Sequence, residues 1–300
     1  MSERGAGPGS PQGAPPSRLG ARDVRALLES HGLHAAKALG QHFVVDPNTV
    51  ERIARLAGVK PGDRVVEIGP GLGSLTLALV ASGAAVTAVE VDRRLVALLG
   101  EVLPPSVRLV AADARTCDWQ SLLAGDNWVL VANLPYNVAT PLVLDLLVGV
   151  PQITRMLVMV QREVGERLAA DPGDEAYGAV SARRAYFATA RVVGHVPATV
   201  FHPRPRVESV LVAIERRDQP AVDPGDASYA EVDTLLRAGF ATRRKMLRRA
   251  LAGLVEMEDF AAAGVAPSAR AEELTLAEWG KLAACRRRHS DPSRSAPGPS

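Results

Sequence analysis

The sequence predicts an α/β protein with a Rossmann-like sheet of seven strands, followed by a small domain made only of helices. Three observations lead to this fold class. Apolar, β-branched runs alternate with helically spaced segments between residues 63 and 170, which is typical of parallel strands joined by crossover helices. Two later strand-like runs leave no room for a helix between them, so they should pair antiparallel. From residue 229 to about 288 every segment has helical spacing.

The expected elements follow in chain order. The parallel strands should cover residues 63–69, 84–92, 107–114, 127–136 and 154–161. Helices are expected at 72–83, 93–103, 138–148 and 162–170. The antiparallel pair should cover 190–201 and 207–217, on either side of the segment "HPRPR". Five parallel strands that end in an antiparallel pair are the pattern of class I, seven-stranded methyltransferases.

Polar, proline-rich segments suggest the domain boundaries. We expect disordered Gly/Pro/Ser tails at both ends and a polar linker between the α/β domain and a small helical domain. In order, the predicted segments are 1–20, 21–217, 218–228, 229–288 and 289–300.

Composition excludes several classes of protein. The two cysteines, Cys117 and Cys285, lie far apart and belong to no Cys/His cluster, which argues against a disulfide framework and a metal site. No apolar stretch reaches the ~18–20 residues of a membrane span, and the N-terminus has no apolar signal core. We therefore expect a cytoplasmic protein, without metal and as a monomer.

Charge is unevenly distributed along the chain. The net charge is only +2, yet residues 237–249, "RAGFATRRKMLRR", contain six cations and no acid. Such a run is often just the solvated face of a helix, but here the usual interleaved acids are missing. An anionic partner such as RNA is the other interpretation. The candidate phosphate-binding residues are Arg243, Arg244, Lys245, Arg248 and Arg249.

A glycine-rich turn follows the first strand. In "VVEIGPGLGSLT", Gly69, Gly71 and Gly73 permit the positive φ angles and close backbone approach that a bound cofactor requires. The dinucleotide-binding motif G-x-G-x-x-G/A would instead place its third small residue at position 74, one residue after Gly73. The spacing instead resembles motif I of methyltransferases that use S-adenosylmethionine, with Glu67 just before the glycines.

Two carboxylates end the next strands. Glu90 should accept hydrogen bonds from ribose hydroxyls, whereas Asp92 should cap the following helix. Asp113 is placed to accept from an adenine amino group. An isolated Asp is more often a cap or turn residue, but the glycines and Glu90 in this order favour a ligand.

The fourth strand ends in "ANLPYN". An exocyclic aromatic amine is a poor nucleophile, because its lone pair is delocalised into the ring. The side-chain oxygen of Asn133 and the carbonyl of Leu134 can accept from both amino hydrogens and localise that lone pair. Pro135 stiffens the turn, and Tyr136 offers a face on which a flipped-out base can stack. Related motifs occur in methyltransferases that act on planar nitrogens.

Several further segments resemble the ribosomal RNA adenine dimethyltransferases, over roughly residues 37 to 282. "KALGQHFVVD" resembles their K-S-L-G-Q-N-F-L-x-D opening, and "NLPYNVATPLVLDLL" their motif IV. "VQREVGERLAADPGDEAYGAVSARRAYF" resembles the segment after their fifth strand. "VFHPRPRVESVLV" and "FATRRKMLRRAL" resemble their F-x-P-x-P-K-V-D-S and F-x-x-R-R-K-x-L-x-x-x-L blocks. These last blocks favour the bacterial small-subunit (KsgA/RsmA) type.

The resemblance implies dimethylation, from S-adenosylmethionine, of N(6) on each of two adjacent adenosines. These lie in the 3′-terminal hairpin loop of 16S rRNA within a pre-30S particle. It also implies that Phe201 joins Tyr136 around the target base. The implied cofactor contacts are Gln41, His42, Val44, Glu67, Gly69, Gly71, Gly73, Glu90, Asp113 and Asn133.

One residue departs from the family pattern. His42 stands where the G-Q-N-F motif has asparagine, and we expect its imidazole to stay neutral and to replace part of the amide's hydrogen bonding. Three alternatives stay open: a macrolide-resistance methyltransferase of 23S rRNA, a ribosome-assembly checkpoint factor that mainly binds, and a relative of mitochondrial transcription factors. The missing Arg-rich presequence argues against the third.

Overall fold

The sheet has seven strands and the predicted mixture of directions. The computed structural model describes residues 18–36, 40–136, 138–242 and 244–290. The strand order is β4-β3-β2-β5-β6-β9-β7. The first five of these are parallel, and β9 runs antiparallel to both β6 and β7. The strands are β2 Arg64–Ile68, β3 Ala85–Glu90, β4 Arg108–Ala111, β5 Trp128–Asn133, β6 Ile153–Gln161, β7 Ala188–Val196 and β9 Ser209–Arg216. The expected antiparallel pair is thus confirmed, with the later strand inserted before the earlier one.

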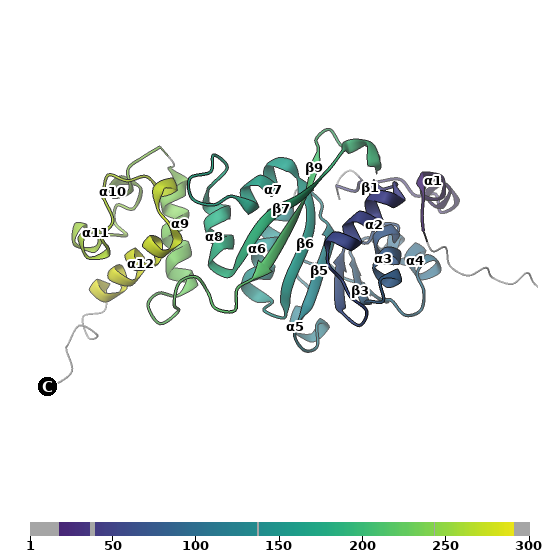
Figure 1. Cartoon of the computed structure of the whole chain (residues 1–300), viewed down its shortest axis with the longest axis horizontal. Coiled ribbons are helices and arrows are strands. Elements are labelled where there is room, and N and C mark those ends of the chain that lie inside the picture. The colour runs from purple at the N-terminus through teal and green to yellow at the C-terminus, as the bar shows by residue number, and fades with distance from the viewer. Residues whose placement is uncertain (1–17, 37–39, 137, 243, 291–300) are drawn as a thin grey trace, which may run out of the picture.

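Helices cover both faces of the sheet (Figure 1). On one face, α5, α6 and α7 contribute to a core cluster with alternate residues of the strands. On the other face, α2 and α3 pack on the intervening strand residues, and α1 packs with α4 at the margin. These helices are α1 Ala21–Ser30, α2 Pro47–Leu56, α3 Ser74–Ala81, α4 Arg93–Val102, α5 Trp119–Leu122, α6 Ala139–Gly149 and α7 Arg162–Ala169. No helix among them, or elsewhere in the described residues, is long and apolar enough to cross a membrane.

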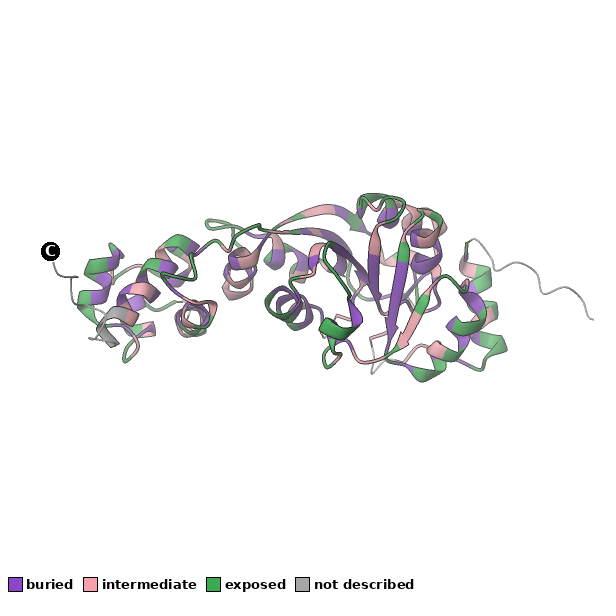
Figure 2. Ribbon diagram, turned by 90° about the horizontal axis from the view of Figure 1, so that it is seen from below, coloured by how far each residue is buried: buried purple, intermediate pink, exposed green. Residues whose placement is uncertain are grey.

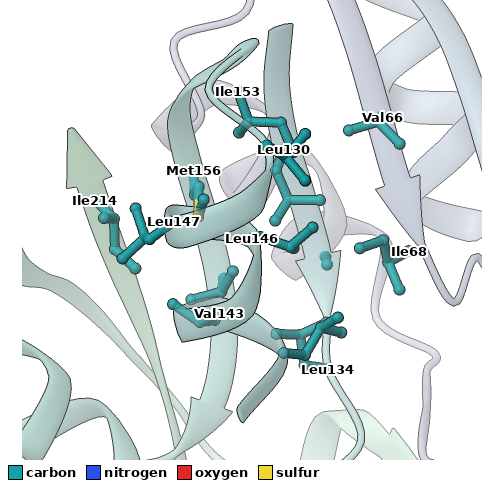
Figure 3. Packing of buried hydrophobic residues seen from close by; sticks show 14 of the residues in the cluster. Val66, Ile68, Leu130, Leu134, Val143, Leu146, Leu147, Ile153, Met156 and Ile214 are labelled. Carbon is teal, nitrogen blue, oxygen red and sulfur yellow. The ribbon is translucent and has the colours of Figure 1, made fainter. Parts of the chain in front are cut away.

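The packing of α6 on the sheet shows how every second residue of a strand is buried in the core (Figure 3). Val143, Leu146 and Leu147 of α6 point at Leu130 of β5 and Met156 of β6, and all five side chains are nearly fully buried. Burial of one such side chain contributes about 1.5–3 kcal/mol relative to its exposure. Figure 2 shows the same concentration of buried residues along the central strands. This packing fixes the end of β5, where the "NLPY" segment begins.

The helical region contains α9 Tyr229–Ala241, α10 Leu247–Ala250, α11 Met257–Ala263 and α12 Leu276–Ser290. Its core surrounds Trp279 and also includes Tyr177 and Tyr186, which flank or belong to α8, Ala179–Phe187. Val222 and Ala227, from the segment predicted as a linker, are buried in the same core. The helical region therefore shares its core with part of the α/β region, although its boundaries at 217 and 229 stay a prediction.

Two arginines of α8 connect it to its neighbours. Arg184 is buried, and its guanidinium donates to the main-chain carbonyls of Leu168, Ala170 and Ala188 at 2.8, 2.9 and 3.2 Å. Arg183 forms an ion pair of 2.6 Å with Asp233 of α9. One side of α8 is thus tied to α7 and β7, and the other to the helical region.

A second, very short sheet pairs two segments far apart in the sequence. β1, Phe43–Val44, runs antiparallel to β8, Phe201–His202, with Val44 opposite Phe201. The predicted end of the strand at 190–201 was wrong, since β7 ends at Val196 and Pro197 follows. A proline cannot donate to a sheet ladder, and a 3-10 turn follows it before β8.

Candidate active site

A cavity of about 340 Å³ opens beside the carboxyl ends of β2, β3 and β5. Ligands of open α/β sheets bind at this edge. Twelve of the predicted site residues line the cavity, and Gly73 and Phe201 do not. The lining residues are Gln41, His42, Val44, Glu67, Gly69, Gly71, Glu90, Asp113, Asn133, Leu134, Pro135 and Tyr136.

The three glycines adopt the left-handed conformations for which they were predicted. Their φ angles are +70°, +60° and +88° at Gly69, Gly71 and Gly73. A Cβ at Gly71 would lie 2.9 Å from the Phe43 ring, and one at Gly73 would lie 2.9 Å from Leu103. A side chain at Gly71 or Gly73 would thus clash with the core, and the main chain of Gly69 and Gly71 itself forms part of the cavity wall. Gly73 does not line the cavity, and its lack of a side chain lets the loop pack closely against Leu103.

Glu67 lies beneath this loop and is only 1% exposed. The hydroxyl of Thr76 donates to its Oε2 at 2.6 Å. The pKa of this carboxyl is raised to about 8, mainly by burial, which outweighs the lowering by the Thr76 hydrogen bond, and in smaller part by the charge of Glu90. A neutral acid under the glycine loop is therefore expected near pH 7. Its contact with a cofactor stays a prediction.

Replacement of Glu67 by glutamine should flatten the pH dependence of stability. The unfolded chain releases this proton near the ordinary value of 4.5, but the folded protein keeps it until about 8. The stability that the raised pKa contributes is present below 4.5 and is lost as pH rises through about 8. Urea unfolding at about pH 5 and about pH 9 should show the wild type losing more free energy of unfolding than the variant. Equal losses would contradict the raised pKa.

Asp92 and Glu90 lie at the end of β3, where Asp92 has its predicted role and the ribose contact of Glu90 stays a prediction. Asp92 caps α4 by accepting from the main-chain N–H of Arg94 at 3.0 Å, so its predicted capping role is confirmed. The hydrogen bonds from Arg94 lower the pKa of Asp92 to about 2. Glu90 lines the cavity, is buried, and accepts from the Asp92 N–H at 2.9 Å. Burial raises the pKa of Glu90, and main-chain N–H groups partly offset this.

Gln41 and Asp113 make contacts that the sequence did not predict. The side chain of Gln41 accepts from the Ala36 N–H at 2.8 Å and donates to Asp92 at 3.3 Å, so it holds the N-terminal segment against α4. Both oxygens of Asp113 accept from the side chain of Arg115, which lowers the pKa of Asp113. An adenine amino group would have to share this carboxylate with Arg115.

Asn133 is oriented by the segment before β1. Its Nδ2 donates to the main-chain carbonyl of His42 at 2.9 Å. This bond identifies Oδ1 as the side chain's acceptor for a ligand. Pro135 closes the turn, since its carbonyl accepts from Val138 and Ala139 at 3.1 Å each. Asn133 and Tyr136 both line the cavity, and the catalytic role of Asn133 stays a prediction.

Tyr136 is half-buried and held on two sides. Its hydroxyl and that of Ser209 lie 3.0 Å apart, and the ring of His42 stacks on it with centroids 5.6 Å apart. Ser209 is fully buried at the start of β9. Sequence reasoning missed Ser209, although it closes the quoted "FHPRPRVES" block, because the long-range contact with Tyr136 leaves no local pattern.

Phe201 does not reach the cavity. It is only 4% exposed and belongs to the core cluster that contains Val44, Ile53 and Leu211. Its β1 partner, Val44, does line the cavity, so Phe201 packs behind the wall rather than on it. The role of Phe201 at the target base stays a prediction.

The predicted phosphate-binding residues surround the turn between α9 and α10. Arg244, Lys245, Arg248 and Arg249 are all exposed, and none forms an ion pair with a described acid. Arg243 lies outside the described residues. The run is therefore not one face of a continuous helix, and its cations point into solvent from a turn and a short helix. Elsewhere in the described chain, no group of three or more His, Cys, Asp or Glu residues is placed to hold a metal ion.

The chain is similar to several known proteins. The model of the family "Ribosomal RNA adenine dimethylase" matches residues 32–285. A Thermobifida fusca protein named ribosomal RNA small subunit methyltransferase A is 49% identical over 277 residues, 87% of this chain and 93% of that protein. An Acidothermus cellulolyticus protein of the same name is 47% identical over 275 residues, with 88% and 93% covered.

Two solved structures share the fold and confirm the predicted class I methyltransferase architecture. A dimethyladenosine transferase from Plasmodium falciparum has a TM-score of 0.64 at 23% identity, over 79% of this chain and 94% of that one. The 23S rRNA methyltransferase ErmE has a TM-score of 0.62 at 22% identity, over 82% and 99%. Since the family match covers most of the sequence and the relatives align over nearly their whole length, this chain belongs to the ribosomal RNA adenine dimethylase family.

Proposed function

We propose that this chain uses S-adenosylmethionine to dimethylate N(6) of two adjacent adenosines in the 3′-terminal hairpin loop of 16S rRNA. The substrate is the pre-30S particle, which the protein meets in the cytoplasm as a monomer, and the modification contributes to small-subunit biogenesis. The observation that supports the proposal is Asn133, whose Nδ2 donates to the His42 carbonyl, which leaves Oδ1 as the amide's acceptor in a cavity that Tyr136 also lines.

On the cofactor side, the residues present suit a nucleoside with a charged amino-acid tail. S-adenosylmethionine supplies a methyl group on a sulfonium sulfur. The open backbone at Gly69 and Gly71 admits the ligand, Glu90 would accept from ribose hydroxyls, and Asp113 from the adenine amino group. No pyrophosphate needs to be cradled, which agrees with a loop, residues 69–74, that carries no cation.

On the acceptor side, the residues would make the adenine amine more nucleophilic by holding it in a fixed orientation. Oδ1 of Asn133 and the Leu134 carbonyl would accept the two amino hydrogens of adenine, while Tyr136 stacks on the base. Transfer then depends on holding the amine in line with the methyl group. No strong base is needed beforehand, because the methylated ammonium loses its proton readily. This accounts for a site whose central side chain is an amide.

The named relatives favour the small-subunit substrate over 23S rRNA. Both relatives at 47–49% identity are called small subunit methyltransferases, whereas the 23S enzyme shares only the fold at 22%. The test is to incubate the protein with labelled S-adenosylmethionine and either undermethylated 30S subunits or 23S rRNA, and then map dimethyladenosine. Label confined to 23S rRNA would reverse the assignment, and tight particle binding without label would favour a checkpoint factor.

Charge reversal at the α9–α10 turn should weaken binding to pre-30S particles and leave cofactor binding intact. Arg244 and Arg248 are exposed and unpaired with described acids, so they should contact phosphates rather than bases. Each lost phosphate contact should lower the slope of log affinity against log salt by about 0.7–0.9. Filter binding of an Arg244→Glu/Arg248→Glu variant at several salt concentrations measures this. Reversal of Arg25 on α1, also exposed, serves as control, and an unchanged slope in the double variant would refute the assignment.

A further inference from the structure

We propose that the Arg115 side chain competes with the adenine amino group of the cofactor for Asp113, and so sets how well the cavity distinguishes adenine from hypoxanthine. This inference rests on the proposed function, since it places the adenine of an S-adenosyl ligand at Asp113. Arg115 acts through that carboxylate, away from the transferred methyl group, and is therefore a specificity-determining residue.

The first observation is how fully Arg115 occupies the carboxylate of Asp113. Its main-chain N–H and Nε donate to Oδ1 at 2.9 and 3.2 Å, and its Nε and Nη2 donate to Oδ2 at 3.2 and 2.7 Å. A carboxylate offers about four lone-pair sites on its two oxygens. The contacts from Arg115 match that number, so an adenine amino group can bond to Asp113 only if one of them is given up.

The second observation is which of these contacts can be given up. The main-chain N–H of Arg115 belongs to a turn in which the Asp113 carbonyl accepts from Thr116 at 3.0 Å. The Arg115 side chain, in contrast, is 60% exposed, and both Arg115 and Asp113 line the cavity. An exposed ion pair contributes little, because water solvates both of its partners well. The guanidinium is therefore the group that an incoming amino group displaces.

The effect on selectivity depends on the group at position 6 of the purine. Adenine carries an amino group there, which donates to a carboxylate, whereas hypoxanthine carries a carbonyl, which only accepts. With Arg115 present, the guanidinium can donate to that carbonyl as well as to Asp113. Without Arg115, the carbonyl would face the carboxylate with no hydrogen between the two acceptors, which is unfavourable. Arg115 thus weakens the binding of adenine and makes hypoxanthine tolerable.

A second pair of the same geometry lies outside the cavity. Arg94 donates from its main-chain N–H and Nε to Oδ1 of Asp92 at 3.0 Å each, and from Nη2 to Oδ2 at 2.8 Å. The Arg94 side chain is 57% exposed, close to the value for Arg115. Neither Asp92 nor Arg94 lines the cavity. Arg94→Met therefore removes an equal charge and an equal ion pair without changing the wall at Asp113.

Calorimetric titration with S-adenosylhomocysteine and S-inosylhomocysteine measures the proposed effect, because these two ligands differ only in the base. Loss of an exposed ion pair is a change of roughly two- to five-fold, so Arg115→Met should lower the Kd for S-adenosylhomocysteine by that factor. The Kd for S-inosylhomocysteine should rise by about two-fold or more, because its carbonyl then faces the carboxylate directly. Arg94→Met should leave both Kd values within about 1.5-fold of the wild type.

Three results would overturn this assignment. An unchanged or higher Kd for S-adenosylhomocysteine in Arg115→Met would show that Arg115 does not compete with adenine. An unchanged or lower Kd for S-inosylhomocysteine would remove its role in selectivity, and equal shifts in the two variants would reveal an effect of charge alone. Thermal unfolding checks that both variants keep the fold. A wild type that binds S-adenosylhomocysteine but methylates neither rRNA would refute the proposed function and leave this assignment standing, so the two failures are distinguishable.

Discussion

Replacement of Asn133 by alanine should nearly abolish methyl transfer and leave the protein folded. The variant loses Oδ1, the acceptor that would orient the adenine amine, and also the Nδ2 hydrogen bond to His42. Loss of one preorganised hydrogen-bonding group in an active site typically lowers kcat by roughly 10²–10³-fold. The lost hydrogen bond should cost only about 1 kcal/mol of folding stability. Single-turnover methylation of undermethylated 30S subunits measures the first effect, and urea unfolding the second.

Asn48→Ala is the matched control, because Asn48 is exposed on α2 and lies outside the cavity lining. Its methylation rate should equal that of the wild type. If Asn133→Ala methylates within about ten-fold of the wild type, the amide is not the group that activates the amine. The assignment of "NLPY" as the catalytic segment would then fail, even though the family would stand.

Replacement of Arg184 by methionine should strongly destabilise the protein. Methionine is a flexible apolar side chain, but it leaves the carbonyls of Leu168, Ala170 and Ala188 without the guanidinium. Each buried carbonyl left without a donor costs about 1–3 kcal/mol, so we expect a loss of roughly 3 kcal/mol or more in the free energy of unfolding. Urea unfolding of the variant and the wild type measures the difference.

Arg217 offers a control with the same chemistry at the surface. Its exposed guanidinium also donates to one carbonyl, that of Ala185, at 3.1 Å. Water can replace the arginine there, so Arg217→Met should change the free energy of unfolding by about 0.5 kcal/mol or less. If the two variants lose similar amounts, burial of Arg184 is not what makes its hydrogen bonds important.

The parallel part of the fold was predictable because its signals are local. Each buried strand is a short apolar run that ends in a turn, and the helices between strands show their own spacing. Asp92 could be predicted as a cap because a side chain two residues from its partner is visible in the sequence. The glycine loop could be predicted because positive φ angles favour one residue type.

What could not be predicted depends on pairing between distant segments. Nothing in residues 188–216 indicates that β9 lies between β6 and β7, because both strands are apolar and both could pair with β6. The β1–β8 pairing joins segments about 160 residues apart, and with it come the contacts of His42 with Pro203 and of Tyr136 with Ser209. Phe201 was predicted at the end of a long strand, whereas the turn at Pro197 carries it into the core.

The shared core of the helical region shows a similar limit. Tyr177 and Tyr186 look like residues of an α/β domain by their position in the chain, and the 218–228 segment looks like a linker by its composition. Both interpretations follow from local sequence alone. Tyr177, Tyr186 and the buried residues of the 218–228 segment nevertheless complete the cluster around Trp279. The helices after residue 229 are too few to bury that cluster by themselves.

The strand order also affects when parts of the protein can fold during its synthesis. β7 pairs with no described strand except β9, which is synthesised after it, so β7 has no place in the sheet until Arg216 has left the ribosome. Ser209, the residue that holds Tyr136, begins that same strand. A nascent chain that already contains the glycine loop and "NLPY" therefore still lacks the hydrogen-bond partner of Tyr136. Translation itself thus delays the moment at which the contact between Tyr136 and Ser209 can form.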